Sequence, residues 1–61
     1  AKVVVFSGHV APALIDRALD AGVWGYVSKN DGEDELLCAL REVMGGRVAL
    51  SPEVRAVYDR A

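Results

Sequence analysis

Covalent staples are almost absent from this sequence of 61 residues, which contains one cysteine, Cys38, and one histidine, His9. A single cysteine excludes an internal disulfide, and no cluster of metal-ligand residues offers a substitute. Because a chain of this length buries only a small core, its folding free energy lies near zero unless further surface is buried. The sequence therefore predicts that the fold is stabilised by contact with a partner surface.

Long hydrophobic runs and an excess of positive charge are also missing. Uninterrupted apolar runs, such as residues 3–6, are far too short to cross a bilayer, and no segment resembles a signal peptide. We therefore expect a cytoplasmic chain without a membrane partner. The formal net charge of -2 also disfavours a nucleic-acid phosphate backbone as the main partner.

Two short apolar segments predict β-strands. Residues 2–6 contain three consecutive valines and a phenylalanine, and continuous apolar character is typical of a parallel strand covered on both faces, so we expect a central strand. Residues 23–27 form a second strand-like run that Gly25 interrupts. The shortness of this second run predicts an edge strand.

An amphipathic helix is predicted after each strand. In the first, Pro12 suits the first turn, Gly22 suits the end, and one face carries Ala11, Leu14, Ile15, Ala18 and Leu19. In the second, Asn30 or Asp31 is available as the N-cap, Gly45-Gly46 suits the end, and the apolar residues are Leu36, Leu37, Leu40, Val43 and Met44. The order strand, helix, strand, helix predicts an α/β fold built on a right-handed βαβ unit.

A short third helix is predicted near the end of the chain. Ser51-Pro52-Glu53 is a good helix start, and Val54, Val57, Tyr58 and Ala61 follow it. A helix of this length frays when it is isolated.

Several of these segments together resemble one known family. The segments are a strand that ends in Ser7, a helix that ends in Ala18-Leu19-Asp20-Ala21-Gly22, and Gly25-Tyr26-Val27-Ser28-Lys29. In combination they resemble the C-terminal half of a response-regulator receiver domain of the CheY-like type. Residues 35–43 and 46–52 are similar to receivers that precede a LuxR-type helix-turn-helix, and the resemblance covers about residues 2–54.

The resemblance implies a partial flavodoxin-like βαβα unit with a short C-terminal helix, lacking the first three strands of the receiver. Residues 1–50 would be the half receiver, and residues 51–61 the start of a linker helix. The missing half would carry the acidic pair that binds Mg²⁺ and the aspartate that accepts the phosphoryl group, so we expect no cofactor in this chain. Since Ala1 opens directly into a core strand, we expect a truncated piece, whether natural, proteolytic or engineered.

The resemblance also implies roles for three side chains. Ser7 would donate its hydroxyl to a phosphoryl oxygen, and Lys29 would supply a positive charge to the same group. Tyr26 would be the switch aromatic. The simpler alternatives are a turn serine, a surface lysine and a static packing residue. Relatives often follow the lysine with a cis proline, but Asn30 stands here, and a non-proline cis bond is too costly to expect.

Other chemistry is less well supported. Ser7 near His9 lacks the Gly-x-Ser-x-Gly frame of a nucleophile elbow, so we do not expect an enzyme. Cys38 lies in the middle of an amphipathic helix, which we interpret as the place of a buried structural thiol. Trp24 is interpreted either as an exposed interface residue or as part of the core.

The predicted function is that of a truncated receiver in a two-component phosphorelay, whose parent regulates transcription and meets a sensor histidine kinase and DNA only as the complete protein. The alternative is a stand-alone module that self-associates without phosphochemistry. In either case we expect a homodimer, formed through the strand edge at Val3, Val4 and Val5 or by swapped helices. DNA binding by the last two helices is disfavoured by the long connection between them and by the negative charge.

Overall fold

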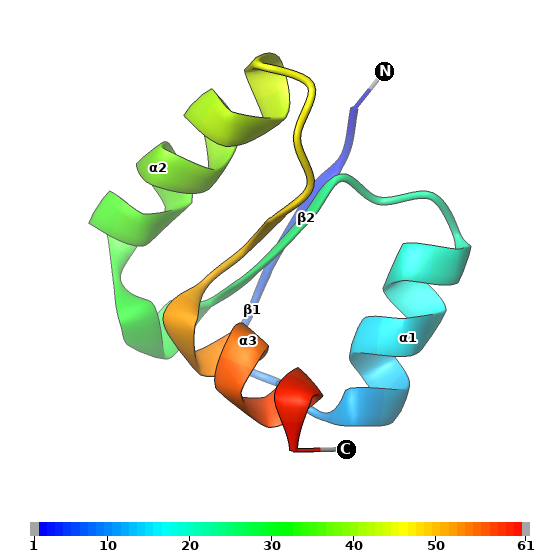
Figure 1. The fold of residues 1–61 in the computed structure, drawn as a ribbon. Helices are drawn as coiled ribbons and strands as arrows, with labels where there is room; N and C mark the ends of the chain where they lie inside the picture. Colours follow the sequence, from blue (N-terminus) through cyan, green and yellow to red (C-terminus); the bar gives the residue numbers. More distant parts are fainter. Residues whose placement is uncertain (1, 61) are drawn as a thin grey trace.

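A computed structural model describes residues 2–60. It contains a three-stranded parallel sheet with β1 at Val4–Ser7, β2 at Gly25–Ser28 and β3 at Ala49–Leu50. The helices are α1 at Pro12–Asp20, α2 at Glu33–Met44 and α3 at Pro52–Asp59, and a 3-10 turn, η1, covers Lys29–Asp31 (Figure 1). The predicted α/β class is confirmed, and the two predicted strands and three predicted helices follow one another in the expected order, with β3 and η1 as additional elements. Ala61, the last residue of the predicted third helix, lies outside the described residues.

The strand order corrects two predictions. The sheet is ordered β1-β2-β3, so β2 is the central strand and β1 is an edge strand of the described sheet. We expected the reverse, because the longer valine run favoured the central place. β3, which has only two residues, completes the sheet by pairing Ala49 with Gly25 and Leu50 with Tyr26. This third strand has no sequence pattern long enough to identify it.

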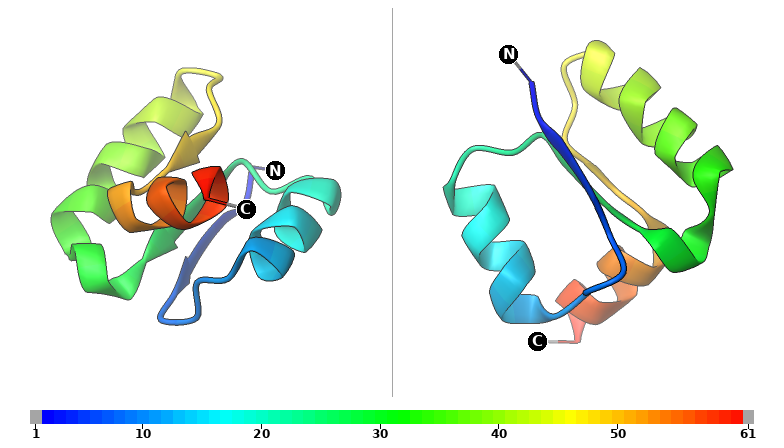
Figure 2. Two further views of the ribbon diagram at one scale, coloured as in Figure 1. Left: turned by 60° about the horizontal axis from the view of Figure 1, so that its bottom comes forward. Right: turned by 180° about the vertical axis from the view of Figure 1, so that it is seen from behind.

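Helices cover both faces of the sheet. On one face α2 packs Ala39 and Val43 against Val27 of β2 and Ala49 of β3. On the other face α1 and α3 meet β2, and the buried cluster consists of Ile15, Tyr26 and Val54. The two views of Figure 2 show α1 and α2 on opposite sides of the strands, with α3 close to the end where β1 and β2 stop. The sheet is therefore covered by helices from three parts of the chain, and α3 lies near the carboxyl ends of β1 and β2.

The helix ends follow their local sequence, with one exception. Pro12 and Gly45 stand where expected, and Ala11 caps α1 without a side-chain hydrogen bond. The N-cap of α2 is neither Asn30 nor Asp31, as predicted, but Gly32, whose φ of 87° is in the region that favours glycine. The two predicted capping residues lie in the η1 turn instead.

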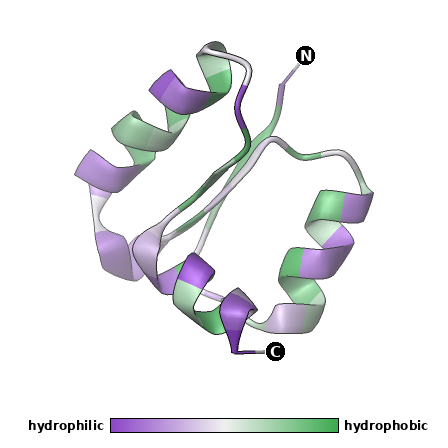
Figure 3. Cartoon of the chain, in the orientation of Figure 1, coloured by the Kyte–Doolittle hydropathy of each residue, from purple (hydrophilic) through white to green (hydrophobic). Residues whose placement is uncertain are grey.

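The outer side of α2 is more apolar than expected. Leu37, Leu40 and Met44 are exposed, although all three were assigned to the buried face. Cys38 is also exposed, which corrects the prediction of a buried thiol. Figure 3 shows hydrophobic and hydrophilic residues alternating along the helices. The helix reaches the sheet through the small Ala39 and through Val43, and this rotates the larger side chains away from the sheet.

α3 is tied to α1 by a side-chain hydrogen bond. The Tyr58 hydroxyl donates to Asp16 Oδ1 over 2.8 Å. This bond, together with the negative charge of Asp16, raises the pKa of Tyr58 above its ordinary value of 10.0. The fold therefore favours the protonated phenol.

The pH dependence of this contact follows from the direction of the shift. Its contribution to stability is complete below pH 10.0 and is lost as the pH rises through the raised pKa of Tyr58. We expect Asp16→Asn to return the pKa of Tyr58 toward its ordinary value, as followed by NMR of the Tyr58 ring carbon. Asp34→Asn, an equal charge change in the first turn of α2, should leave this pKa in place; equal effects of both variants would contradict the assignment.

Candidate functional site

Ser7 and Lys29 come together at the carboxyl ends of two adjacent strands. Ser7 is the last residue of β1, and its register partner across the parallel pair is Ser28, the last residue of β2. Lys29 follows directly in the η1 turn. Open α/β sheets bind their ligands at the carboxyl ends of their strands, so this is the expected position for a ligand contact.

The Lys29 side chain is exposed, and its ammonium lies 6.0 Å from the centroid of the Phe6 ring. It forms no ion pair with any residue that the structure describes. Its charge is therefore available to an incoming anion. The Ser7 hydroxyl accepts a hydrogen bond from the His9 backbone N–H at 3.0 Å, and this bond leaves its own proton free to donate. Ser7 is thus a turn serine in the local geometry and still has the donor that anion binding needs.

Tyr26 lies inside the core, and its hydroxyl reaches the loop that follows Ser7. Its ring is buried between α1 and α3, and the hydroxyl donates to the His9 carbonyl oxygen over 2.6 Å. The geometry connects the central strand to the β1–α1 loop. Whether Tyr26 changes position stays a prediction. His9 is exposed and contacts the site only through its backbone, so the geometry shows no serine–histidine pair.

A network of polar side chains, which the sequence did not predict, joins the η1 turn to the start of α3. The buried Ser28 hydroxyl donates to Glu53 Oε1 at 2.5 Å, and the Asn30 amide donates to the same carboxylate at 3.3 and 3.4 Å. The Ser28 backbone N–H also donates to Ser51 Oγ at 3.0 Å, and in the other direction the Glu53 backbone N–H donates to Asp31 Oδ2 at 2.9 Å. The signal in the sequence was Ser28 itself, a polar residue at the end of a buried strand that needs a partner.

The residues predicted for interfaces have mixed surroundings. Trp24 is half-buried against the core on the α2 side, and the Lys2 ammonium lies 4.7 Å from its ring centroid. It is therefore a packing residue with one covered face. Val3, Val4 and Val5 lie on the edge strand or next to it, and Val3 is 53% exposed. Figure 2, seen from behind, shows β1 in front of the sheet with no described element beyond it.

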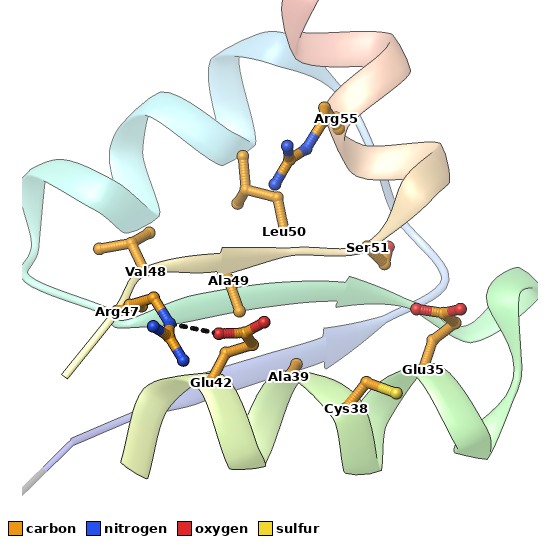
Figure 4. Close-up of a pocket in the computed structure, with 10 residues that line it drawn as sticks. All are labelled: Glu35, Cys38, Ala39, Glu42, Arg47, Val48, Ala49, Leu50, Ser51 and Arg55. Atoms are coloured by element: carbon orange, nitrogen blue, oxygen red, sulfur yellow. Dashed lines mark hydrogen bonds and ion pairs between the residues drawn. The ribbon is translucent and has the colours of Figure 1, made fainter. Parts of the chain in front are cut away.

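An open groove of about 300 Å³ lies between α2, β3 and α3 on the opposite side of the molecule from β1. Its lining mixes acidic, basic and apolar side chains, among them Glu35, Cys38 and Arg55 (Figure 4). At one end Arg47 forms an ion pair with Glu42, and both side chains are well exposed, so the pair adds little stability. No charge of one sign prevails in this groove.

Two features were not found among residues 2–60. No helix in this range has the length and apolar character required to cross a membrane. Nor do three side chains of the types that bind metals come together there. The residues at the strand ends, a hydroxyl and an ammonium, are not a ligand set for Mg²⁺, which prefers carboxylate oxygens.

Comparison with known proteins places the chain beside transcriptional regulators. It is 41% identical over 51 residues to the transcriptional regulatory protein UhpA of Salmonella typhimurium. It is 36% identical over 53 residues to the transcriptional regulatory protein DesR of Bacillus subtilis. These matches cover 84% and 87% of this chain but only 26% and 27% of the relatives, so the chain spans about a quarter of their length. No family model matches the chain.

A solved structure shows the same fold. The two-component response regulator of the LuxR family from Aurantimonas sp. superposes with a TM-score of 0.93 and 32% sequence identity. The match covers 98% of this chain and 43% of that one. The predicted partial flavodoxin-like unit is thereby confirmed as a fold, and the chain is similar to one part of a LuxR-family response regulator.

Proposed function

We propose that this chain acts as the C-terminal half of a phosphoryl-receiving signalling domain in a two-component transcriptional regulator. Ser7 and Lys29 contact the phosphoryl group, and an aspartate outside this chain carries it. The resulting change in shape passes through Tyr26 and the helices to a transcriptional output. On this proposal the chain has no catalytic activity of its own, and the protein works in the cytoplasm, where a sensor histidine kinase and DNA meet it only as the complete regulator.

The observation that carries the proposal is the pairing of β1 with β2. The register places a hydroxyl donor and an unpaired ammonium at neighbouring strand ends. Lysine acts as a point charge toward a phosphoryl oxygen, and the Ser7 hydroxyl adds a directed hydrogen bond. The match to a two-component response regulator over nearly the whole chain supports the same assignment.

The Mg²⁺ of such a domain would be held by residues outside this chain. The described residues do not form a ligand set for it, and Lys29 would repel a cation brought next to its ammonium. In the proposal this chain supplies anion contacts only.

The first test separates the chain from the complete receiver, which we define as this chain joined to the preceding segment of its protein that carries the acceptor aspartate. Incubation of the chain alone with acetyl phosphate and Mg²⁺ should leave its intact mass unchanged, whereas the complete receiver should gain one phosphoryl group. A stable acyl-phosphate on the chain alone would contradict the proposal and point to Asp16, Asp20 or Asp31 as the acceptor.

The second candidate function is self-association without phosphochemistry, and it rests on the exposed apolar surface. Within residues 2–60, β1 pairs with a neighbouring strand on one side only, and the outer side of α2 exposes Leu37, Leu40 and Met44. An open strand edge of this kind is a template for pairing with a second copy. A two-fold axis beside β1 would produce an antiparallel pair at the centre of a larger sheet.

Two exposed valines on opposite edges of the sheet provide a matched test of this pairing. Val3, beside β1, is 53% exposed, and Val48, beside β3, is 56% exposed. We expect the chain to be a dimer by light scattering coupled to size exclusion, and Val3→Asp to shift it to the monomer because each copy would then bury a carboxylate at the strand edge that pairs. Val48→Asp should remain dimeric. A wild-type monomer with full cooperative secondary structure at micromolar concentration would sink this idea.

A further inference from the structure

The polar network described above surrounds one residue of the candidate site. Ser28 and Asn30 are the neighbours of Lys29 on either side, and both donate hydrogen bonds to the carboxylate of Glu53. Glu53 belongs to the first turn of α3, more than twenty residues away in the chain. Lys29 itself makes no ion pair in the described structure, so Glu53 does not neutralise it.

Hydrogen bonds between the turn and the start of the helix are donated from both sides. Glu53 receives donors from the turn, while its own backbone N–H donates to Asp31 at the end of the turn. Ser28 also accepts at its hydroxyl from the Asn30 N–H over 3.1 Å, and this bond closes the turn on itself. The η1 turn and the start of α3 therefore hold each other at both ends.

The two serines of the network are buried, which makes their hydrogen bonds hard to exchange for water, whereas the Asn30–Glu53 bonds lie at the surface. Ser28 is fully buried and Ser51 nearly so, and within the described residues every buried side-chain nitrogen and oxygen has a hydrogen-bond partner. A buried hydroxyl that loses its acceptor carries an unpaid desolvation penalty. The turn therefore has one preferred position relative to α3.

We propose that Glu53 is a positioning residue for Lys29, which couples the position of its ammonium to that of α3. This inference rests on the proposed function, because it assigns to that phosphoryl site a mechanical connection with the C-terminal helix. An anion that draws Lys29 toward it pulls on Ser28 and Asn30, and thus on α3 through Glu53. Since coupling is reciprocal, a change in the position of α3 alters the affinity of Lys29 for the anion.

The first arm of the test uses the 61-residue chain and needs no phosphorylation. Glu53→Ala should shift the backbone amide signals of residues 28–31 in a nitrogen-15 NMR spectrum, while the methyl signals of Ile15 and Val27 report an intact core. Glu53→Gln keeps an acceptor oxygen for Ser28 and should restore most of the spectrum. Glu33→Gln, the same charge change in the first turn of α2, is the control. Unchanged signals at Lys29 and Asn30 in Glu53→Ala would overturn the inference.

The second arm is a double-mutant cycle in the complete receiver, read out as phosphorylation-driven dimerisation. If Glu53 acts through Lys29, then Glu53→Ala weakens the response roughly tenfold in the wild-type background and has no further effect in Lys29→Ala. Additive effects of the two substitutions would overturn the inference. If Lys29→Ala alone has no effect on the response, the proposed function fails. The NMR spectra of the first arm still show whether Glu53 positions the turn.

Discussion

Replacing Ile15 with alanine is expected to unfold most of the chain, whereas the same change at the adjacent Leu14 leaves it folded. Ile15 is 0% exposed on α1 and fills the cluster with Tyr26 and Val54, while Leu14 is 41% exposed. Truncation of a buried isoleucine costs about 2–5 kcal/mol through lost burial and the remaining cavity. Because so small a domain has little stability to lose, a cost of this size removes most of it.

Urea unfolding followed by far-ultraviolet circular dichroism measures both variants. Leu14→Ala controls for helix propensity, because it places the same residue in the same helix. We expect the urea midpoint of Leu14→Ala to lie close to that of the wild type. The midpoint of Ile15→Ala should be far lower. Equal shifts for the two variants would mean that α1 is not packed on the sheet in the orientation described.

Loss of the Lys29 ammonium is expected to abolish most of the response of the complete receiver to phosphorylation while the fold is retained. The side chain is exposed, and its ammonium lies 6.0 Å from the centroid of the Phe6 ring, so its loss should leave the buried core in place. A hydrogen bond to a charged group contributes roughly 1.5–3 kcal/mol, which corresponds to about a 10- to 150-fold change in an equilibrium. We therefore expect Lys29→Ala to weaken phosphorylation-driven dimerisation by about this factor, with an unchanged melting temperature.

Lys2 provides the control for Lys29, because it is the other lysine of the chain and precedes β1, whereas Lys29 follows β2. Lys2→Ala removes the same charge and loses a contact of its ammonium with the Val43 carbonyl oxygen, but it lies away from the strand ends. The response to phosphorylation should survive in Lys2→Ala. A normal response in both Lys29→Ala and Ser7→Ala would show that the assigned roles are wrong.

Local chemistry explains which parts of the fold were predictable. Pro12 marks the start of α1, and Gly45 marks the end of α2. Both could be predicted because proline and glycine act on the conformation of the backbone next to them. The order of the strands depends on which distant segments pair, and β3 is too short to carry any periodicity. A valine run was therefore placed at the centre of the sheet, although in the described sheet it lies at an edge.

The orientation of α2 shows a second limit. Leu37 and Met44 were expected to be buried because they are large and apolar, but the helix packs through Ala39 and Val43. A small residue at the contact allows a helix to approach a sheet closely, and the choice of face then depends on the shape of that sheet. Exposed leucines are common on protein surfaces, so hydropathy alone does not identify the buried face.

The positions of Ser7 and Lys29 were predictable, but their role stays a prediction. Both residues were identified by resemblance, and the register shows that they lie at the ends of adjacent strands. The role of Glu53 was not visible, because in the sequence it is an ordinary residue of a helix start. Its partners Ser28 and Asn30 lie on a different element, and only the fold brings them to its carboxylate.

The most direct test of the account is a nitrogen-15 NMR comparison of the complete receiver before and after phosphorylation, with intact mass as proof that the phosphoryl group is present. We expect the backbone amide signals of Ser7 and Lys29 to shift most among the residues of this chain, and those of Leu37 and Met44 on the outer side of α2 to shift far less. A phosphorylated protein in which the Ser7 and Lys29 signals do not move would contradict the proposal that these two residues contact the phosphoryl group.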